Sequence, residues 1–130
     1  MNGTTPIISI IALVEDDDPL RDALESMLRA AGFLVDKFSS AEAFLSFPER
    51  QRTDCLVLDI RLPGMSGVEL QRRLLEMNIV IPIVFVTAHG DASVRDLVLR
   101  AGAVGFLTKP VRRTELLESI RAAIGKTAGE

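Results

Sequence analysis

The eight residues IISIIALV, at positions 7–14, run directly into the acidic sequence EDDD at positions 15–18. A nearly continuous run of apolar, β-branched residues is typical of a strand buried on both faces of a parallel sheet. Asp18 is expected to cap a helix that has Pro19 in its first position. The following apolar residues recur at helical spacing up to Gly32: Leu20, Ala23, Leu24, Met27, Leu28 and Ala31.

The same alternation of strand and helix signals continues along the chain. Further strands are predicted at residues 33–38, 81–86 and 104–108, and at the compact apolar run 55–58. Ser39 with Glu42, and Ser66 with Glu69, have the spacing of capping boxes, and the second of these opens a helix through about residue 77. Residues 89–91 are expected to form a turn and cap. The last two helices have predicted apolar faces at Val94, Leu97, Val98 and Ala101, and at Leu116, Leu117, Ile120 and Ile124.

Five strands that alternate with five helices predict a doubly wound α/β fold. The parallel sheet is covered by helices on both faces, and the crossovers are right-handed. We expect one domain over residues 7–124. Residues 1–6 are expected to form a flexible N-terminus, and residues 125–130 a flexible tail or the start of a linker.

Composition excludes several kinds of site. The 130 residues carry 15 Lys and Arg against 18 Asp and Glu, and this net charge of −3 argues against a general nucleic-acid surface. A single cysteine, Cys55, and a single histidine, His89, exclude an internal disulfide and a structural zinc site. The apolar runs are too short to span a bilayer, and the N-terminus does not resemble a secretory signal. We expect a soluble protein of the reducing cytoplasm.

Polar residues follow the predicted strands at their carboxyl ends, where open parallel sheets bind ligands. Glu15 and Asp16 follow the first strand, Asp59 the third, Thr87 the fourth and Lys109 the fifth. Crowded carboxylates favour a bound cation, and all-oxygen ligation suits Mg²⁺. Each residue also has a plainer interpretation: a helix-start acid, a turn residue, a β-branched strand residue or a solvated charge. Together they are parts suited to phosphoryl transfer with a carboxylate nucleophile.

Four blocks of sequence carry a resemblance to a known family: VEDD at 14–17, LDIRLPGMSG at 58–67, VTA at 86–88 and KP at 109–110. With these blocks at matching strand ends, the chain from Ile8 to Ile124 resembles the receiver domain of bacterial two-component response regulators. SAEAFL at 40–45 and AGAVGF at 101–106 are most similar to the FixJ-like subgroup, whose receivers usually precede a helix-turn-helix DNA-binding domain. The resemblance implies a flavodoxin-like sheet with strand order 2-1-3-4-5.

The resemblance also implies a role for each residue of the acidic group. Asp59 would accept a phosphoryl group from a partner histidine kinase. Asp16 would bind Mg²⁺ directly, Glu15 directly or through water, and Asp59 and the backbone carbonyl of Arg61 would complete the protein ligands. Lys109 would pair with the phosphoryl oxygens. Glu15 stands where an aspartate is common in the family, which lengthens this arm of the site.

Three further residues receive roles from the resemblance. Thr87 would hydrogen-bond the phosphoryl group and let the aromatic ring of Phe106 rotate inward, as a two-state switch. Phe106 stands where tyrosine is common, so a plain core phenylalanine is the alternative. Arg61 and His89 occupy positions that flank the path of the attacking water and would tune the phosphoryl lifetime, although solvated loop residues explain them as well.

The implied output is a change in the face formed by the fourth helix, the fifth strand and the fifth helix. This face would bind a second copy or another partner, and DNA would be reached only through an effector domain that is not in this chain. Four arginines lie near the face and could make polar contacts: Arg95, Arg100, Arg112 and Arg113. We expect a signalling domain rather than an enzyme, limited to its own phosphorylation and dephosphorylation.

Three alternatives remain open. The first is a stand-alone receiver that acts by protein contacts, and the second is a binding module independent of phosphorylation. The third is a phosphatase of the haloacid dehalogenase type, but such enzymes carry a second aspartate where this chain has Arg61.

Overall fold

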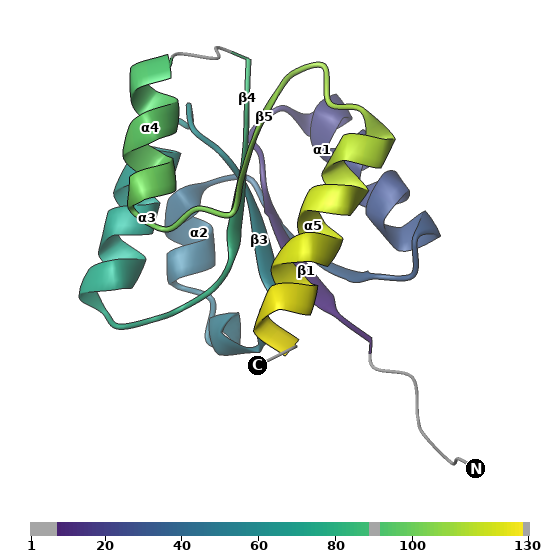
Figure 1. Cartoon of the computed structure of the whole chain (residues 1–130), viewed down its shortest axis with the longest axis horizontal. Helices are drawn as coiled ribbons and strands as arrows, with labels where there is room; N and C mark the ends of the chain where they lie inside the picture. Colours follow the sequence, from purple (N-terminus) through teal and green to yellow (C-terminus); the bar gives the residue numbers. More distant parts are fainter. Residues whose placement is uncertain (1–7, 89–91, 129–130) are drawn as a thin grey trace.

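Five segments of the chain form the strands of one parallel sheet in the computed structural model, which describes residues 8–88 and 92–128 (Figure 1). The strands are β1 (Ile10–Val14), β2 (Leu34–Phe38), β3 (Cys55–Asp59), β4 (Ile83–Thr87) and β5 (Gly105–Thr108). They alternate with α1 (Asp18–Ala30), α2 (Ala41–Leu45), α3 (Gly67–Glu76), α4 (Ala92–Arg100) and α5 (Arg113–Ala128). A short 3₁₀ helix, η1 (Arg50–Arg52), precedes β3 and was not predicted.

The order of the strands in the sheet is β2-β1-β3-β4-β5, and every neighbouring pair is parallel. This order confirms the predicted doubly wound α/β fold and the flavodoxin-like arrangement. The register sets Val14 of β1 opposite Leu58 of β3, and Asp59 of β3 opposite Val86 of β4. The carboxyl ends of the central strands therefore meet at one edge of the sheet.

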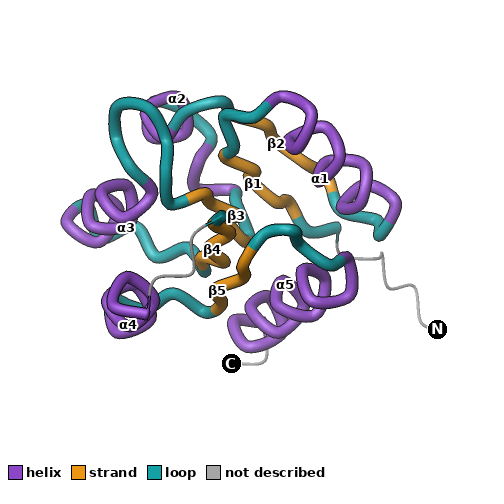
Figure 2. Tube along the Cα trace, turned by 90° about the horizontal axis from the view of Figure 1, so that it is seen from above, coloured by secondary structure: helices purple, strands orange, loops and turns teal. Residues whose placement is uncertain are grey.

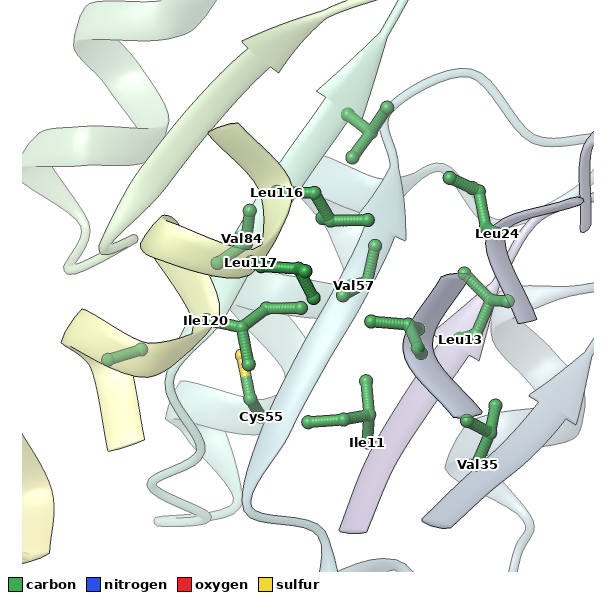
Figure 3. Close-up of a cluster of buried hydrophobic side chains, with 13 residues drawn as sticks. Ile11, Leu13, Leu24, Val35, Cys55, Val57, Val84, Leu116, Leu117 and Ile120 are labelled. Carbon is green, nitrogen blue, oxygen red and sulfur yellow. The ribbon is translucent and has the colours of Figure 1, made fainter. Parts of the chain in front are cut away.

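Helices cover both faces of the sheet, with α1 and α5 on one side and α2, α3 and α4 on the other (Figure 2). Alternate residues of β1 point to opposite faces, so Ile11 and Leu13 pack with α1 and α5 while Ala12 and Val14 pack with the other three helices. Figure 3 shows the first of these two apolar clusters, where side chains of α5 lie against the strands. Burial on both faces explains why the central strands β1, β3 and β4 are nearly all apolar, whereas the edge strand β2 carries Asp36 and Lys37.

The helix starts differ from the predicted caps by one residue in two cases. Asp17, not Asp18, caps α1, and its side chain accepts a hydrogen bond from the Leu20 amide at 3.0 Å. Ser40, not Ser39, caps α2 and accepts from the Ala43 amide at 3.1 Å. The backbone at each true cap is extended, which aims the side chain at the amide three residues later. The predicted capping box of Ser66 and Glu69 at α3 is confirmed.

The apolar face of α4 is narrower than predicted. Val98 is fully buried, whereas Leu97 is 56% exposed and does not belong to the core. Adjacent helical residues point about 100° apart, so a helix whose contact is centred on Val98 turns Leu97 toward solvent. At the end of the chain α5 continues to Ala128, beyond the predicted end at residue 124.

The predicted turn and cap at residues 89–91 lies outside the described residues, as does the predicted flexible segment at residues 1–6. Among the helices of the described part of the chain, none has the length and hydropathy that a membrane crossing requires.

Candidate functional site

Three carboxylates meet at the carboxyl edge of the sheet, which is the upper edge in Figure 1. Glu15 and Asp16 follow β1, and Asp59 is the last residue of β3. One oxygen from each lies within 4.8 Å of the other two. Glu15 and Asp59 are buried, whereas Asp16 is exposed. These hard oxygen donors around one point are a set that suits a divalent cation such as Mg²⁺.

Lys109 joins this group from the end of β5. Its Nζ lies 3.0 Å from Glu15 Oε1 and 3.0 Å from Asp59 Oδ2. Its backbone amide donates to the carbonyl oxygen of Thr87 at 2.8 Å, which joins the ends of β4 and β5. The Lys109–Pro110 peptide bond is cis. Strand ends that lie far apart in the sequence therefore meet around one ammonium group.

The charges of the site do not balance, because Glu15, Asp16 and Asp59 cluster together while one ammonium group, that of Lys109, pairs with Glu15 and Asp59. Burial raises the pKa of the Glu15 carboxyl, against hydrogen bonds from Lys109 and the Asp17 amide, and the nearby charge of Asp59 adds to the rise. Burial alone would lower the pKa of Lys109, but its hydrogen bonds with Glu15 and Asp59 outweigh that effect and raise it. The excess negative charge favours binding of a cation.

The loop after β1 is held by contacts that the sequence analysis missed. The Arg21 guanidinium donates through Nη1 to the carbonyl oxygen of Glu15 at 2.8 Å and through Nη2 to Asp18 Oδ1 at 2.6 Å. The Asp17 amide donates to Glu15 Oε2 at 3.1 Å. The spacing of Asp18 and Arg21 could have predicted their ion pair, because residues three apart are neighbours on a helix surface.

The loop after β3 brings Arg61 to the site through its backbone. The Arg61 amide donates to Asp59 Oδ1 at 3.1 Å, while its side chain is exposed. Gly67 closes this loop against β3, because a Cβ at this position would overlap the carbonyl oxygen of Asp59. Glu42 was also missed as a contributor here: it accepts a hydrogen bond from the Met65 amide.

The remaining predicted residues lie as follows. Thr87 is the last residue of β4 and is 1% exposed. Phe106, in the edge strand β5, is half-buried and packs against the apolar cluster on the side of α2, α3 and α4. His89 lies outside the described residues. The fold thus brings Glu15, Asp16, Asp59 and Lys109 together, with the backbone of Arg61.

Fold and site together define a doubly wound α/β domain with three clustered carboxylates, a set that suits a metal ion, and a partly buried lysine at its strand ends. The chain belongs to the family described as the response regulator receiver domain, whose sequence profile matches residues 11–121. The predicted resemblance is therefore confirmed, and relatives of the FixJ type support the predicted subgroup.

Among curated proteins, the chain is 46% identical over 116 residues to the response regulator protein TodT of Pseudomonas putida, covering 89% of this chain and 51% of that protein. It is 43% identical over 113 residues to the transcriptional regulatory protein FixJ of Rhizobium meliloti, covering 87% of this chain and 55% of that protein. The chain thus spans about half the length of these relatives.

Solved structures give the same assignment. The crystal structure of FixJ-N matches with a TM-score of 0.83 and 41% identity over 92% of this chain and 95% of that one. The receiver domain of a sensor histidine kinase from Pseudomonas aeruginosa, with a magnesium ion coordinated in its active site cleft, matches with a TM-score of 0.81 and 31% identity. That match covers 92% of this chain and 99% of the other.

Proposed function

We propose that Asp59 is the phosphoacceptor of this receiver domain and takes its phosphoryl group from a histidine of a partner sensor kinase. The observation that carries the proposal is the setting of the Asp59 carboxylate, which ends β3 at the ligand-binding edge of the sheet. One of its oxygens contacts Lys109 Nζ, and the other accepts from the Arg61 amide. A carboxylate held in this way is oriented for attack on phosphorus.

In the proposed transfer, an oxygen of Asp59 forms a bond to phosphorus as the bond between phosphorus and the donor imidazole nitrogen breaks. The nitrogen keeps the bonding electrons. Lys109 lies where its ammonium can neutralise charge on the phosphoryl oxygens, and the Thr87 hydroxyl is proposed to donate a hydrogen bond to one of them. Positioning and charge neutralisation supply most of the rate enhancement in such transfers.

The metal of this reaction is proposed to be Mg²⁺, held by Glu15, Asp16, Asp59 and the backbone carbonyl of Arg61. Support comes from the three carboxylate oxygens within 4.8 Å of one another and from the magnesium ion in the similar histidine kinase receiver. When bound, Mg²⁺ would neutralise negative charge where the phosphoryl group enters. We expect it to keep several of its waters, as Mg²⁺ usually does in proteins.

The proposed output is a change in the face formed by α4, β5 and α5. Thr87 and Phe106 are proposed to move as a pair when the phosphoryl group is present, and the altered face is proposed to form a homodimer. Arg61 and His89 are proposed to tune the phosphoryl lifetime. The domain would act in the cytoplasm as a signalling element, and its only chemistry would be its own phosphorylation and dephosphorylation.

Regulation of transcription is the proposed consequence. FixJ is a transcriptional regulatory protein, and this chain matches only about half the length of the relatives. Contact with DNA would require an effector domain outside these 130 residues. A stand-alone receiver that acts by protein contacts is the alternative output.

Incubation with acetyl phosphate and Mg²⁺ tests the proposal. We expect one acyl phosphate on Asp59, detected by intact mass and by reduction with borohydride followed by peptide mapping. Asp59→Asn should abolish the label, and Asp22→Asn, which removes an exposed carboxylate of α1, should retain it. Label that persists in Asp59→Asn contradicts the assignment of this residue, and multiple turnover of small phosphomonoesters would favour a phosphatase.

A further inference from the structure

A carboxylate from α2 holds the loop that follows Asp59. Glu42 Oε2 accepts a hydrogen bond from the Met65 amide at 2.8 Å, across 23 residues of sequence. Glu42 is exposed, so the contact is not a by-product of core burial. The sequence pattern predicted that Glu42 would form a capping box with Ser39, yet its carboxylate lies against the loop between β3 and α3.

The loop is shaped to receive this carboxylate. Gly64 has a φ of +76°, and a Cβ at this position would overlap Glu42 Oε2. Glycine therefore serves both the backbone conformation and the close approach of the side chain. The hydrogen bond from the Met65 amide lowers the pKa of Glu42, which indicates that the ionised form makes the contact. A charge-assisted bond of this kind is stronger than one between neutral groups.

The other contacts of the loop lead to Asp59. At its start, the Arg61 amide donates to Asp59 Oδ1 at 3.1 Å. At its end, the Gly67 amide donates to the Ile60 carbonyl oxygen at 2.9 Å, and the capping box of α3 orders Ser66. The Glu42 contact lies between these two ends, so it restrains the part of the loop that they leave free.

The base of this carboxylate is itself rigid. Ser40 caps α2, and Phe44 of the same helix is fully buried and packs edge-on against Phe38, with ring centroids 5.4 Å apart. The short helix therefore has a fixed position on the sheet. A fixed α2 can transmit its position to the loop through one side chain.

We propose that Glu42 is a positioning residue for the phosphoacceptor site, which restrains the β3–α3 loop and so keeps the Arg61 backbone against Asp59. This inference rests on the proposed function, because Arg61 is there assigned a carbonyl ligand to Mg²⁺. Loss of Glu42 leaves every proposed metal ligand in the chain. The loop that positions the Arg61 carbonyl is then less restrained, so the binding of Mg²⁺ is weakened. The transfer step itself stays intact once Mg²⁺ is saturating.

The test compares Glu42→Ala and Glu42→Gln with a control, Glu49→Ala. The control removes an exposed glutamate between α2 and η1. In metal-free protein, amide NMR should show the Met65 resonance titrating with a midpoint below 4.5, the ordinary value for a glutamate. This titration should vanish in both Glu42 variants and persist in Glu49→Ala. The Arg61 amide resonance should shift in Glu42→Ala and not in Glu49→Ala.

The second readout is phosphorylation by acetyl phosphate over a range of Mg²⁺ concentrations. We expect the half-saturating Mg²⁺ concentration to rise about fivefold in Glu42→Ala, below the range for direct partners of metal ligands because Glu42 acts through the loop. The rate at saturating Mg²⁺ should stay at the wild-type value. Glu42→Gln, which keeps an oxygen acceptor, should recover most of the affinity for Mg²⁺.

Different results would contradict the positioning role of Glu42 and the proposed phosphoacceptor function. An unchanged Arg61 resonance together with an unchanged Mg²⁺ midpoint in Glu42→Ala would overturn the positioning role, even if Met65 shifts. An equal loss in Glu49→Ala would overturn it too, because general charge would then explain the effect. Absence of label in the wild-type protein contradicts the proposed function alone, since the metal-free NMR measurement still tests the link from Glu42 to Arg61.

Discussion

Replacement of Lys109 by methionine tests how the site balances its buried charges. The Lys109 ammonium lies 3.0 Å from both Glu15 and Asp59, whose side chains are only 2% and 6% exposed. Methionine retains most of the length of the side chain and removes its charge. We therefore expect Lys109→Met to lower the free energy of unfolding in the absence of Mg²⁺.

The magnitude follows from the distances. At an effective dielectric constant of about 20, unit charges no more than 4.8 Å apart, as in the acidic group, repel by about 3.5 kcal/mol or more. Loss of one partner from a buried ion pair costs about 3 to 5 kcal/mol. Since Glu15 can take up a proton and relieve the repulsion, we expect a loss near the lower end, about 3 kcal/mol at neutral pH.

The loss should depend on pH with a definite sign. The pKa of Glu15 is already raised in the folded protein, and it should rise further without the ammonium. A carboxyl whose pKa is higher in the folded state loses stability as pH rises from its unfolded pKa through its folded pKa. The difference between variant and wild type should therefore be small near pH 4 and grow toward neutral pH. It should shrink again in alkali, where wild-type Lys109 loses its proton.

The free energy of unfolding is measured by urea denaturation, with far-UV circular dichroism as the signal. Fluorescence is unsuitable because the chain has neither tryptophan nor tyrosine. Lys37→Met is the matched control: Lys37 pairs with Glu25 at 3.0 Å on the surface, so little change is expected. In an Asp59→Asn background the loss of Lys109 should be smaller, and Mg²⁺ should restore Lys109→Met more than it stabilises wild type. An equal loss in both backgrounds, or no loss at neutral pH, would show that Lys109 does not offset the charges of Glu15 and Asp59.

Three further predictions test the packing of the fold. Gln71→Met removes the hydrogen bond from the buried Gln71 amide to the Val98 carbonyl oxygen at 3.0 Å, and should lower the free energy of urea unfolding by about 1 kcal/mol; an unchanged value would mean that the bond adds no net stability. Gly67→Ala places a Cβ against the Asp59 carbonyl oxygen, so thermal unfolding should report a loss of about 2 kcal/mol, and an undiminished melting temperature would contradict this packing. Cys55 is fully buried, and burial raises the pKa of its thiol to about 12. Ellman's reagent should therefore modify it only after unfolding, and rapid reaction with the native protein is the contrary result.

Local patterns in the sequence predicted most of the fold because each depends on neighbouring residues. The apolar run at 7–14 predicted β1, and the spacing of Ser66 and Glu69 predicted the start of α3. The errors arose where neighbours compete for one role. Asp17 and Asp18 could both cap α1, and only the extended backbone at Asp17 decides between them. Leu97 and Val98 are both apolar, and only the orientation of α4 on the sheet decides which is buried.

By itself, the sequence determined which polar residues end the strands, because strand boundaries follow from apolar periodicity and polar residues at those boundaries must lie at the sheet edge. The tertiary structure decided which atoms meet. β1 lies between β2 and β3, so Glu15 and Asp59 become neighbours although 44 residues separate them, and Lys109 reaches both from the far strand β5. The contact of Glu42 with Met65 likewise depends on the packing of α2 beside the β3–α3 loop. Propensity acts over a few residues, whereas contacts between distant segments are set by how the layers pack.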